Sequence, residues 1–174
     1  VMLVAISGLP GSGTTTAGRL LADALGWEFQ SSGELFRSMA DARGVSLAEF
    51  GALAENDERI DRELDDRAVT LMRGAAGLVM EGRLAGWMAF RNAFGEARVW
   101  LESDAATRAR RVADRDGGSA SEQQATMAVR ETSEAARYLD YYNIDIGSRE
   151  PYTLLIDSGA LAPNAIVARI RGAL

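Results

Sequence analysis

The residues best suited to chemistry in this sequence form a glycine-rich stretch near the N-terminus. Apart from one position it matches the pattern G-x-x-x-x-G-K-[ST], in which backbone N–H groups surround a phosphate. A short apolar run precedes the stretch, and apolar residues at helical spacing follow it over Thr14–Leu25, so it has the expected strand–loop–helix context. We therefore expect a triphosphate-binding loop with the Thr15 hydroxyl as a ligand to Mg²⁺. Its residues are Gly8, Leu9, Pro10, Gly11, Ser12, Gly13, Thr14, Thr15 and Thr16.

The loop departs from the pattern at the lysine position, which Thr14 occupies. That lysine normally contacts the β- and γ-phosphates. Two alternatives follow: a glycine-rich turn without a ligand, or a phosphate site that has lost catalysis. If the loop is active, arginine from elsewhere in the chain must supply the missing positive charge.

The composition excludes several kinds of chemistry. The chain of 174 residues contains no cysteine and no histidine, and its 19 basic residues are all arginine. Thiolate catalysis, disulfides and cysteine–zinc sites are therefore excluded, and so is histidine as a general base. Phosphoryl transfer fits the remaining side chains, because it depends on positioning and charge neutralisation. A net charge of −6 argues against nucleic acid as a partner.

The hydrophobic pattern predicts an α/β fold. Expected strands lie at 2–7, 27–30, 78–80, 98–101 and 153–156, and expected helices at 14–25, 32–43, 47–54, 57–73, 104–115, 121–142 and 164–173. Short apolar strands that alternate with helices indicate a five-stranded parallel sheet flanked by helices, in a single domain over 1–174. The segment at about 32–76 is too long for a simple crossover and is expected to be a helical insertion beside the sheet. No apolar stretch reaches the ~20 residues of a membrane helix, and no secretory signal is visible.

Several runs in one order resemble the archaeal-type cytidylate kinases, and the resemblance covers nearly the whole chain. The runs are Gly8 to Thr16, Ser32-Gly33-Glu34-Leu35-Phe36-Arg37, Ala54-Glu55 with Asp57 and Ile60-Asp61, Glu81-Gly82-Arg83-Leu84-Ala85-Gly86-Trp87-Met88, Arg130-Glu131-x-Ser133-Glu134-x-x-Arg137-Tyr138 and Tyr142-Asn143-Ile144-Asp145-Ile146. The resemblance implies a P-loop NTPase fold of the nucleoside-monophosphate kinase type, with a helical acceptor-binding insertion (about 32–76) and a mobile lid (about 112–136). It also implies ATP as donor, Mg²⁺ as the ion and CMP or dCMP as acceptor. The segment Arg149-Glu150-Pro151-Tyr152 departs from the expected family pattern.

The residues expected to bind the acceptor are inferred partly from their charge and partly from the resemblance. A monophosphate carries about two negative charges, which a planar arginine fork binds well, and Arg37 and Arg83 are the expected clamps. For Arg37 the alternative is an ordinary exposed helix arginine. Ser32, Gly33 and Gly82 are assigned to the acceptor on the resemblance.

Carboxylates near these positions have two interpretations each. Glu81 ends an expected strand and could hold a water of Mg²⁺ or position Arg83, or it could be an ordinary charge at a helix start. Asp61 and Asp65 share one helix face and are expected to recognise the base or the ribose. A solvated acidic face beside Arg62 and Arg67 is the alternative.

Arginines in the expected lid are the proposed catalytic groups. Arg108, Arg111 and Arg115 follow i, i+3, i+7 spacing, and Arg130 and Arg137 lie seven apart on the next helix. We expect Arg111, Arg115, Arg130 and Arg137 to neutralise the triphosphate, while Arg108 and Arg110 are weaker candidates. Ordinary ion pairing is the alternative; the available partners are Asp114, Asp116, Glu131 and Glu134. The three tryptophans, Trp27, Trp87 and Trp100, are expected to pack in the core.

These features predict a (d)CMP kinase that is monomeric, cytoplasmic, and bound to neither nucleic acid nor membrane. One alternative is a P-loop kinase for another small acceptor, such as AMP, UMP or a non-nucleotide alcohol, against which the run Glu81–Met88 argues. A second is a nucleotide-binding regulatory module without turnover. The preference among CMP, dCMP and UMP requires geometry that the sequence does not contain.

Overall fold

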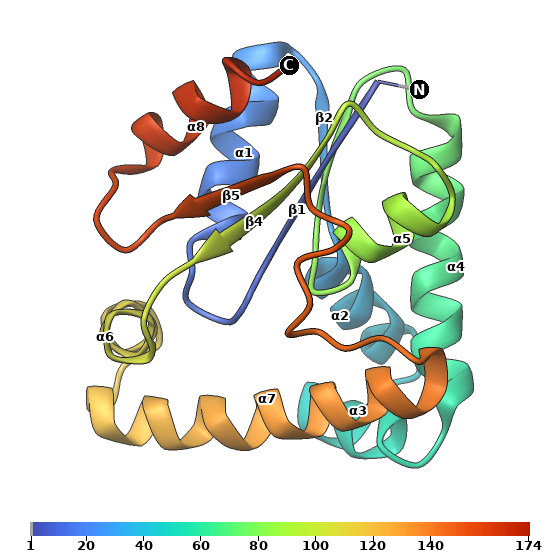
Figure 1. Ribbon diagram of the computed structural model, residues 1–174. Coiled ribbons are helices and arrows are strands. Elements are labelled where there is room, and N and C mark those ends of the chain that lie inside the picture. The colour runs from blue at the N-terminus through green and yellow to red at the C-terminus, as the bar shows by residue number, and fades with distance from the viewer. Residues whose placement is uncertain (1) are drawn as a thin grey trace.

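The core of the protein is a five-stranded parallel β-sheet in the strand order β2-β3-β1-β4-β5 (Figure 1). The computed structural model describes residues 2–174. The strands are β1 (Leu3–Gly8), β2 (Glu28–Ser31), β3 (Leu78–Glu81), β4 (Ala97–Glu102) and β5 (Leu154–Asp157). The predicted five-stranded parallel sheet is therefore confirmed.

The central strand explains why the sheet has two covered faces. All six residues of β1 are buried, as expected for a strand of a parallel sheet between two helical layers. Leu3 packs against α4 (Glu58–Gly74) and α5 (Ala85–Arg91), whereas Val4 packs against α1 (Thr14–Leu25) and α8 (Pro163–Arg171). The alternation of side chains along a strand thus assigns one pair of helices to each face.

The carboxyl ends of the strands meet at one edge of the sheet. Ile6 pairs with Glu81 of β3, and Gly8 pairs with Leu101 of β4. In such sheets ligands bind outside the carboxyl ends of the strands. The glycine-rich loop after β1 and the side chains that follow β3 therefore share one region.

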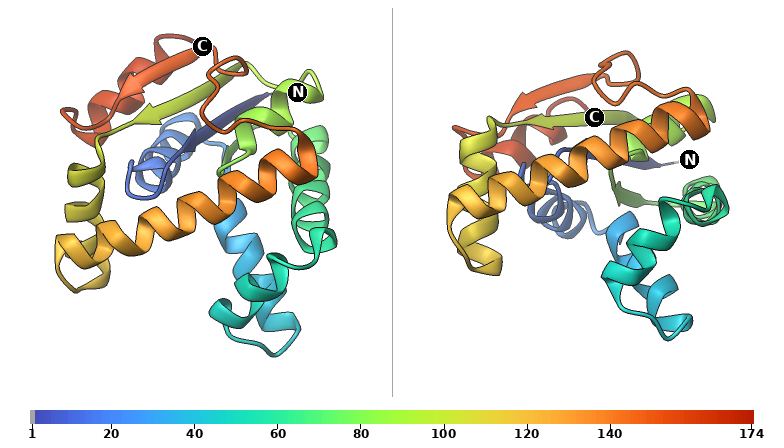
Figure 2. Two further views of the ribbon diagram at one scale, coloured as in Figure 1. Left: turned by 60° about the horizontal axis from the view of Figure 1, so that its bottom comes forward. Right: turned by 90° about the horizontal axis from the view of Figure 1, so that it is seen from below.

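Two helical units lie beside this edge. The first consists of α2 (Ser32–Ala42), α3 (Leu47–Ala54) and the start of α4, which bury Met39 and Phe50 in a small core of their own. The second is a pair of helices, α6 (Ala105–Asp116) and α7 (Ala120–Tyr142). Helix α7 runs along the carboxyl edge from α6 to the α3–α4 region (Figure 2).

The predicted element boundaries differ from the observed ones by at most two residues. One element was missed: α5, which begins within the run Glu81–Met88 that was interpreted only as a motif. Trp87 of this helix is 7% exposed and Trp100 of β4 is 1% exposed, so the core interpretation of these tryptophans is confirmed. Among residues 2–174, no helix has the length and apolar character needed to span a bilayer.

Two helix glycines give opposite predictions for stability. A methyl group at Gly86 in α5 would overlap the ring of Tyr152. A methyl group at Gly51 in α3 would have no heavy atom within 4 Å outside its chain neighbours and its own helix backbone. We expect Gly86→Ala to lower the free energy of unfolding by about 1–3 kcal/mol through overpacking. Gly51→Ala should raise it by about 0.5–1 kcal/mol, because alanine restricts the unfolded chain and favours helix. Urea denaturation of both variants measures these changes in the free energy of unfolding. A higher free energy of unfolding for Gly86→Ala would contradict the close contact between Gly86 and Tyr152.

Candidate active site

The loop between β1 and α1 has the backbone conformation of a phosphate-binding loop. Gly11 and Gly13 have φ angles of 80° and 90°, in the left-handed region that glycine adopts without strain. Gly13 is the N-cap of α1, and the helix begins at Thr14. The first N–H groups of a helix have no partner within the helix, and they favour an anion at that end. The predicted loop is therefore present with its predicted helix.

Two buried side chains hold this loop from behind. The Ser158 hydroxyl donates to the Ser12 carbonyl at 2.7 Å, and Arg108 Nη1 donates to the Pro10 carbonyl at 2.9 Å. Arg108 is only 5% exposed. The loop is thus fixed to the segment after β5 and to helix α6.

Thr14 and Glu81 interact directly. Thr14 Oγ1 donates to Glu81 Oε1 at 2.9 Å, and Ser31 Oγ donates to Glu81 Oε2 at 2.7 Å. The residue at the lysine position therefore orients a carboxylate at the end of β3. This contact places Glu81 beside the loop, where the sequence analysis expected it.

The donors available here fit a magnesium ion. Mg²⁺ prefers oxygen ligands and is bound through one or two carboxylates together with phosphate oxygens and water. Glu81 supplies a carboxylate, and Thr15 has an exposed side chain at the first turn of α1. Within residues 2–174 no group of three or more acidic, histidine or cysteine side chains could hold a metal by itself. The ion would therefore rely on the nucleotide for most of its ligands.

Arg83 follows β3 and reaches back to the loop. Its Nη1 donates to the Gly8 carbonyl, and its Nε donates to Glu134 Oε2 of α7 at 2.6 Å. The Arg83 side chain is 14% exposed. Burial opposes the charge, but Glu134, Tyr138 and Glu81 together outweigh it and raise the pKa of Arg83. The structure thus brings together Gly8, Thr14, Glu81 and Arg83 from the predicted set.

A second buried ion pair connects α4 to α7. Arg137 Nε donates to Asp61 Oδ2 at 2.9 Å, and Asp61 is 3% exposed. The predicted alternative of a solvated acidic face is wrong for Asp61. Burial raises the pKa of Asp61 although Arg137 opposes the shift. Burial, with a further contribution from the Asp61 carboxylate, raises the pKa of Asp65 to about 7.

The other acceptor residues lie at the start of α2 and after β3. A side chain at Gly82 would overlap Ser32, and a Cβ at Gly33 would stand 3.8 Å from Arg37 Nη1. Arg37 is exposed and makes no hydrogen bond or ion pair with another residue in the range 2–174. Its position is therefore compatible both with a clamp on the acceptor phosphate and with an ordinary exposed helix arginine.

The arginines of α6 contact different partners. Arg111 Nη2 donates to the Ser158 carbonyl at 2.7 Å, whereas Arg115 pairs with the adjacent Asp116 at 2.6 Å. Arg108 points instead toward the loop and pairs with Glu131 at 2.5 Å.

Ion pairing, the predicted alternative, is thus realised at several of these arginines. Arg130 pairs with Glu134 at 2.7 Å. The side chains of Arg115 and Arg130 are 68% and 65% exposed, so each of these pairs is worth only about 0–1 kcal/mol. Arg115 can therefore exchange its partner for a phosphate at little cost, and Arg130 has two Nη groups without a partner in the range 2–174.

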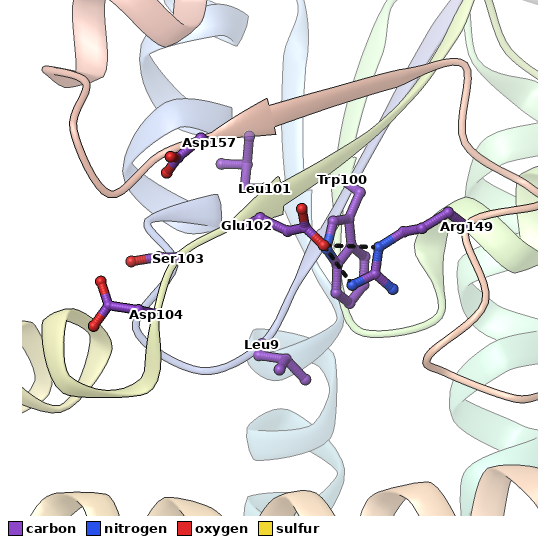
Figure 3. A pocket seen from close by; sticks show the side chains of 8 residues that line it. All are labelled: Leu9, Trp100, Leu101, Glu102, Ser103, Asp104, Arg149 and Asp157. Carbon is purple, nitrogen blue, oxygen red and sulfur yellow. Dashed lines mark hydrogen bonds and ion pairs between the residues drawn. The ribbon is translucent and has the colours of Figure 1, made fainter.

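A pocket of about 340 Å³ opens at the carboxyl ends of β4 and β5 (Figure 3). Leu9 and three carboxylates, Glu102, Asp104 and Asp157, contribute to its lining. Arg149 bonds to Glu102 at 2.7 Å and lies 4.0 Å from the ring centroid of Trp100. Three carboxylates against one paired arginine disfavour a triphosphate. The segment Arg149–Tyr152, which departs from the family pattern, thus lies against β4 through Arg149. It is close to the phosphate loop, because Leu9 lines the same pocket.

The structure gives Arg108 and Glu134 larger parts in the site than the sequence predicted. From the sequence, Arg108 was a weaker candidate and Glu134 only a possible ion-pair partner. Glu134 is 7% exposed and bonds to two predicted site residues. The i, i+4 spacing of Arg130 and Glu134 was visible in the sequence, but the contact with Arg83 spans 51 residues.

The sheet order, the loop and the arginines around it define a P-loop kinase fold. Solved structures agree. A shikimate kinase from Bacteroides thetaiotaomicron superposes with a TM-score of 0.67 at 14% identity, covering 98% of this chain and 96% of that one. A gluconokinase from Sinorhizobium meliloti gives 0.63 at 16% identity, covering 99% and 90%.

Sequence comparison identifies the family. The model of the cytidylate kinase-like family matches residues 3–160. A cytidylate kinase from Halobacterium salinarum is 42% identical over 165 residues, covering 95% of this chain and 85% of that protein. A cytidylate kinase from Methanococcoides burtonii is 45% identical over 157 residues, covering 90% and 87%. The chain belongs to the cytidylate kinase-like family.

The raised pKa of Asp65 predicts a pH-dependent stability. Between about pH 4 and pH 7 the folded chain keeps a proton that the unfolded chain has released, so the free energy of unfolding falls as pH rises. Asp65→Asn removes this effect. The variant should gain stability relative to the wild type across that window, by up to about 1.4 kcal/mol per pH unit. Denaturant unfolding at several pH values tests this.

The control is Asp66→Asn, which changes the neighbouring exposed carboxylate on the same helix. If the free energy of unfolding depends on pH in the same way for Asp65→Asn and the wild type, the folded protein does not keep a proton on the Asp65 carboxyl.

Proposed function

We propose that this protein is a cytidylate kinase, which transfers the γ-phosphoryl group of ATP to CMP or dCMP to give CDP or dCDP and ADP. The observation that carries the proposal is the match of nearly the whole chain to cytidylate kinases at 42% and 45% identity. The geometry supports it, because the phosphate loop, Glu81 and Arg83 lie together at the edge of the sheet where such folds bind ligands.

The loop from Gly8 to Thr16 would bind the triphosphate of ATP through its backbone N–H groups and the start of α1. Thr15 and Glu81 would hold Mg²⁺, Glu81 through a water molecule. When bound, the ion supplies neutralisation of charge on the β- and γ-phosphates. Thr14 would serve by orienting Glu81 rather than by contacting phosphate with a charge.

Arg83 would clamp the acceptor phosphate, with Arg37, Ser32, Gly33 and Gly82 around it. The Nη2 group of Arg83 makes no hydrogen bond to another residue in the range 2–174, so it is available to a phosphate oxygen. Asp61 and Asp65 would recognise the base or the ribose from α4. The segment at about 32–76 would thus act as the acceptor-binding insertion.

The segment at about 112–136 would act as the lid. Its movement would bring Arg115 and Arg130 to the triphosphate, together with Arg111 and Arg137 at its two ends, and exclude water from the transfer. No side-chain nucleophile is needed, because the acceptor phosphate oxygen attacks the γ-phosphorus in line. The arginines would stabilise charge on the oxygens in the transition state.

A monomeric state, a cytoplasmic location and the absence of nucleic-acid binding stay predictions.

The first experiment is a coupled assay of ADP release with ATP, Mg²⁺ and one acceptor at a time. The acceptors are CMP, dCMP, UMP, AMP and shikimate, with a reaction that lacks any acceptor as the baseline. We expect release to be stimulated strongly by CMP or dCMP. Stimulation by shikimate or AMP alone would assign a different acceptor. ATP binding without stimulation by any of them would favour the regulatory module.

Arg83 gives the sharpest mutational test of the proposed clamp. We expect Arg83→Ala to lower kcat/KM for CMP by about 10³-fold or more, since loss of one transition-state arginine costs this order. Arg83→Lys keeps the charge but loses the planar fork and should recover only part of the rate. Steady-state kinetics with CMP varied, together with ATP binding by calorimetry, provide the measurement.

Arg169→Ala is the matched control, because Arg169 is an exposed arginine on α8. Its kinetics should equal those of the wild type. An equal loss in the Arg83 and Arg169 variants would exclude a specific role for Arg83.

A further inference from the structure

One carboxylate in α7 is shared by two arginines from different parts of the fold. Glu134 Oε2 accepts from Arg83 Nε at 2.6 Å, and Glu134 Oε1 accepts from Arg130 Nε at 2.7 Å. Arg83 follows β3, whereas Arg130 lies one turn before Glu134. Both oxygens of a single buried side chain are therefore engaged, each by the Nε group of an arginine.

The use of Nε leaves the ends of both guanidinium groups free. An arginine has five N–H donors in a rigid plane. Arg83 uses Nε and Nη1, while Arg130 uses Nε alone among the contacts within residues 2–174. Nη2 of Arg83 and both Nη groups of Arg130 can thus meet phosphate oxygens while Glu134 continues to hold the two side chains.

The charges explain why a carboxylate is needed between them. Two guanidinium groups that approach the same buried position repel each other. Glu134 is 7% exposed, and burial by itself would raise its pKa. Arg83 and Arg130 overcome this and lower the pKa of Glu134, so it stays ionised and neutralises one of the two positive charges.

We propose that Glu134 is a positioning residue for phosphoryl transfer, which sets the position of the acceptor-side arginine, Arg83, relative to the donor-side arginine, Arg130. The proposal rests on the proposed function, because it assigns these arginines to the two substrates of that reaction. In-line transfer depends on the separation of acceptor oxygen and γ-phosphorus, and a misplacement of about 1 Å costs about 10²-fold in rate. Glu134 would act through the arginines and would not itself touch a phosphate.

The test replaces Glu134 and measures kcat and KM separately. Glu134→Gln keeps the size and the ability to accept a hydrogen bond but lacks the charge. We expect kcat with CMP to fall by about 10²-fold, while KM for ATP changes less than about tenfold. Glu134→Asp keeps the charge on a shorter side chain and should recover part of the loss. Wild-type kcat in Glu134→Gln would overturn the proposal.

A purely structural role would also lower activity, so a second readout is needed. We expect the loss in Glu134→Gln combined with Arg130→Ala to be clearly smaller than the product of the single losses, because one residue acts through the other. Multiplicative losses would overturn the proposal. The control Ile170→Val removes one methyl group from a fully buried side chain of α8, outside the site, and it should lower the unfolding midpoint with little effect on kcat.

Arg130→Lys keeps the proposal testable if the Glu134 variants fail to fold. The Arg130 side chain is 65% exposed, so the variant should fold, but lysine cannot be held at Nε and present two Nη groups. We expect kcat to fall at least about tenfold, and an unchanged kcat would overturn the proposal. Wild-type protein without acceptor-dependent ADP release would instead refute the proposed function. Wild-type turnover of CMP with full activity in Glu134→Gln would refute only the role of Glu134.

Discussion

The buried guanidinium of Arg83 joins the carboxyl edge of the sheet to the helix that crosses it. It bonds to the first residue of the phosphate loop, Gly8, and to Glu134 of α7. A buried arginine needs such partners, because an unpaired charge in the interior costs several kcal/mol. The position of α7 over the site therefore depends on this contact, and so do the positions of the arginines that α7 carries.

Helix α7 makes one long-range ion pair on each of three successive turns. Glu131 contacts Arg108 of α6, Glu134 contacts Arg83, and Arg137 contacts Asp61 of α4. The three side chains are three residues apart and lie on one side of the helix. In this way α7 connects α6, the sheet and the acceptor insertion. A ligand that displaces one partner of these ion pairs therefore acts on α7, which contacts all three parts.

The substitution of threonine for the loop lysine has a local physical consequence. Thr14 orients Glu81 through a neutral hydrogen bond, whereas a lysine there would meet the same carboxylate as a charge. The chain contains no lysine, so every positive side-chain charge is a guanidinium. A guanidinium binds phosphate with two parallel hydrogen bonds and cannot lose its proton in a protein. The positive charge on this site is therefore independent of pH in the physiological range.

The order of the elements, the parallel sheet and the phosphate loop could all be predicted from the sequence, because glycine spacing and hydrophobic periodicity are local properties of the chain. Arg83 and Glu81 could also be predicted as neighbours of the loop, since the ends of parallel strands share one edge. The carboxylates that Arg83 and Arg137 contact became visible in the folded chain alone. Arg83 and Glu134 are 51 residues apart, and Asp61 and Arg137 are 76 apart. Such pairs arise from helix packing, which short-range patterns do not encode.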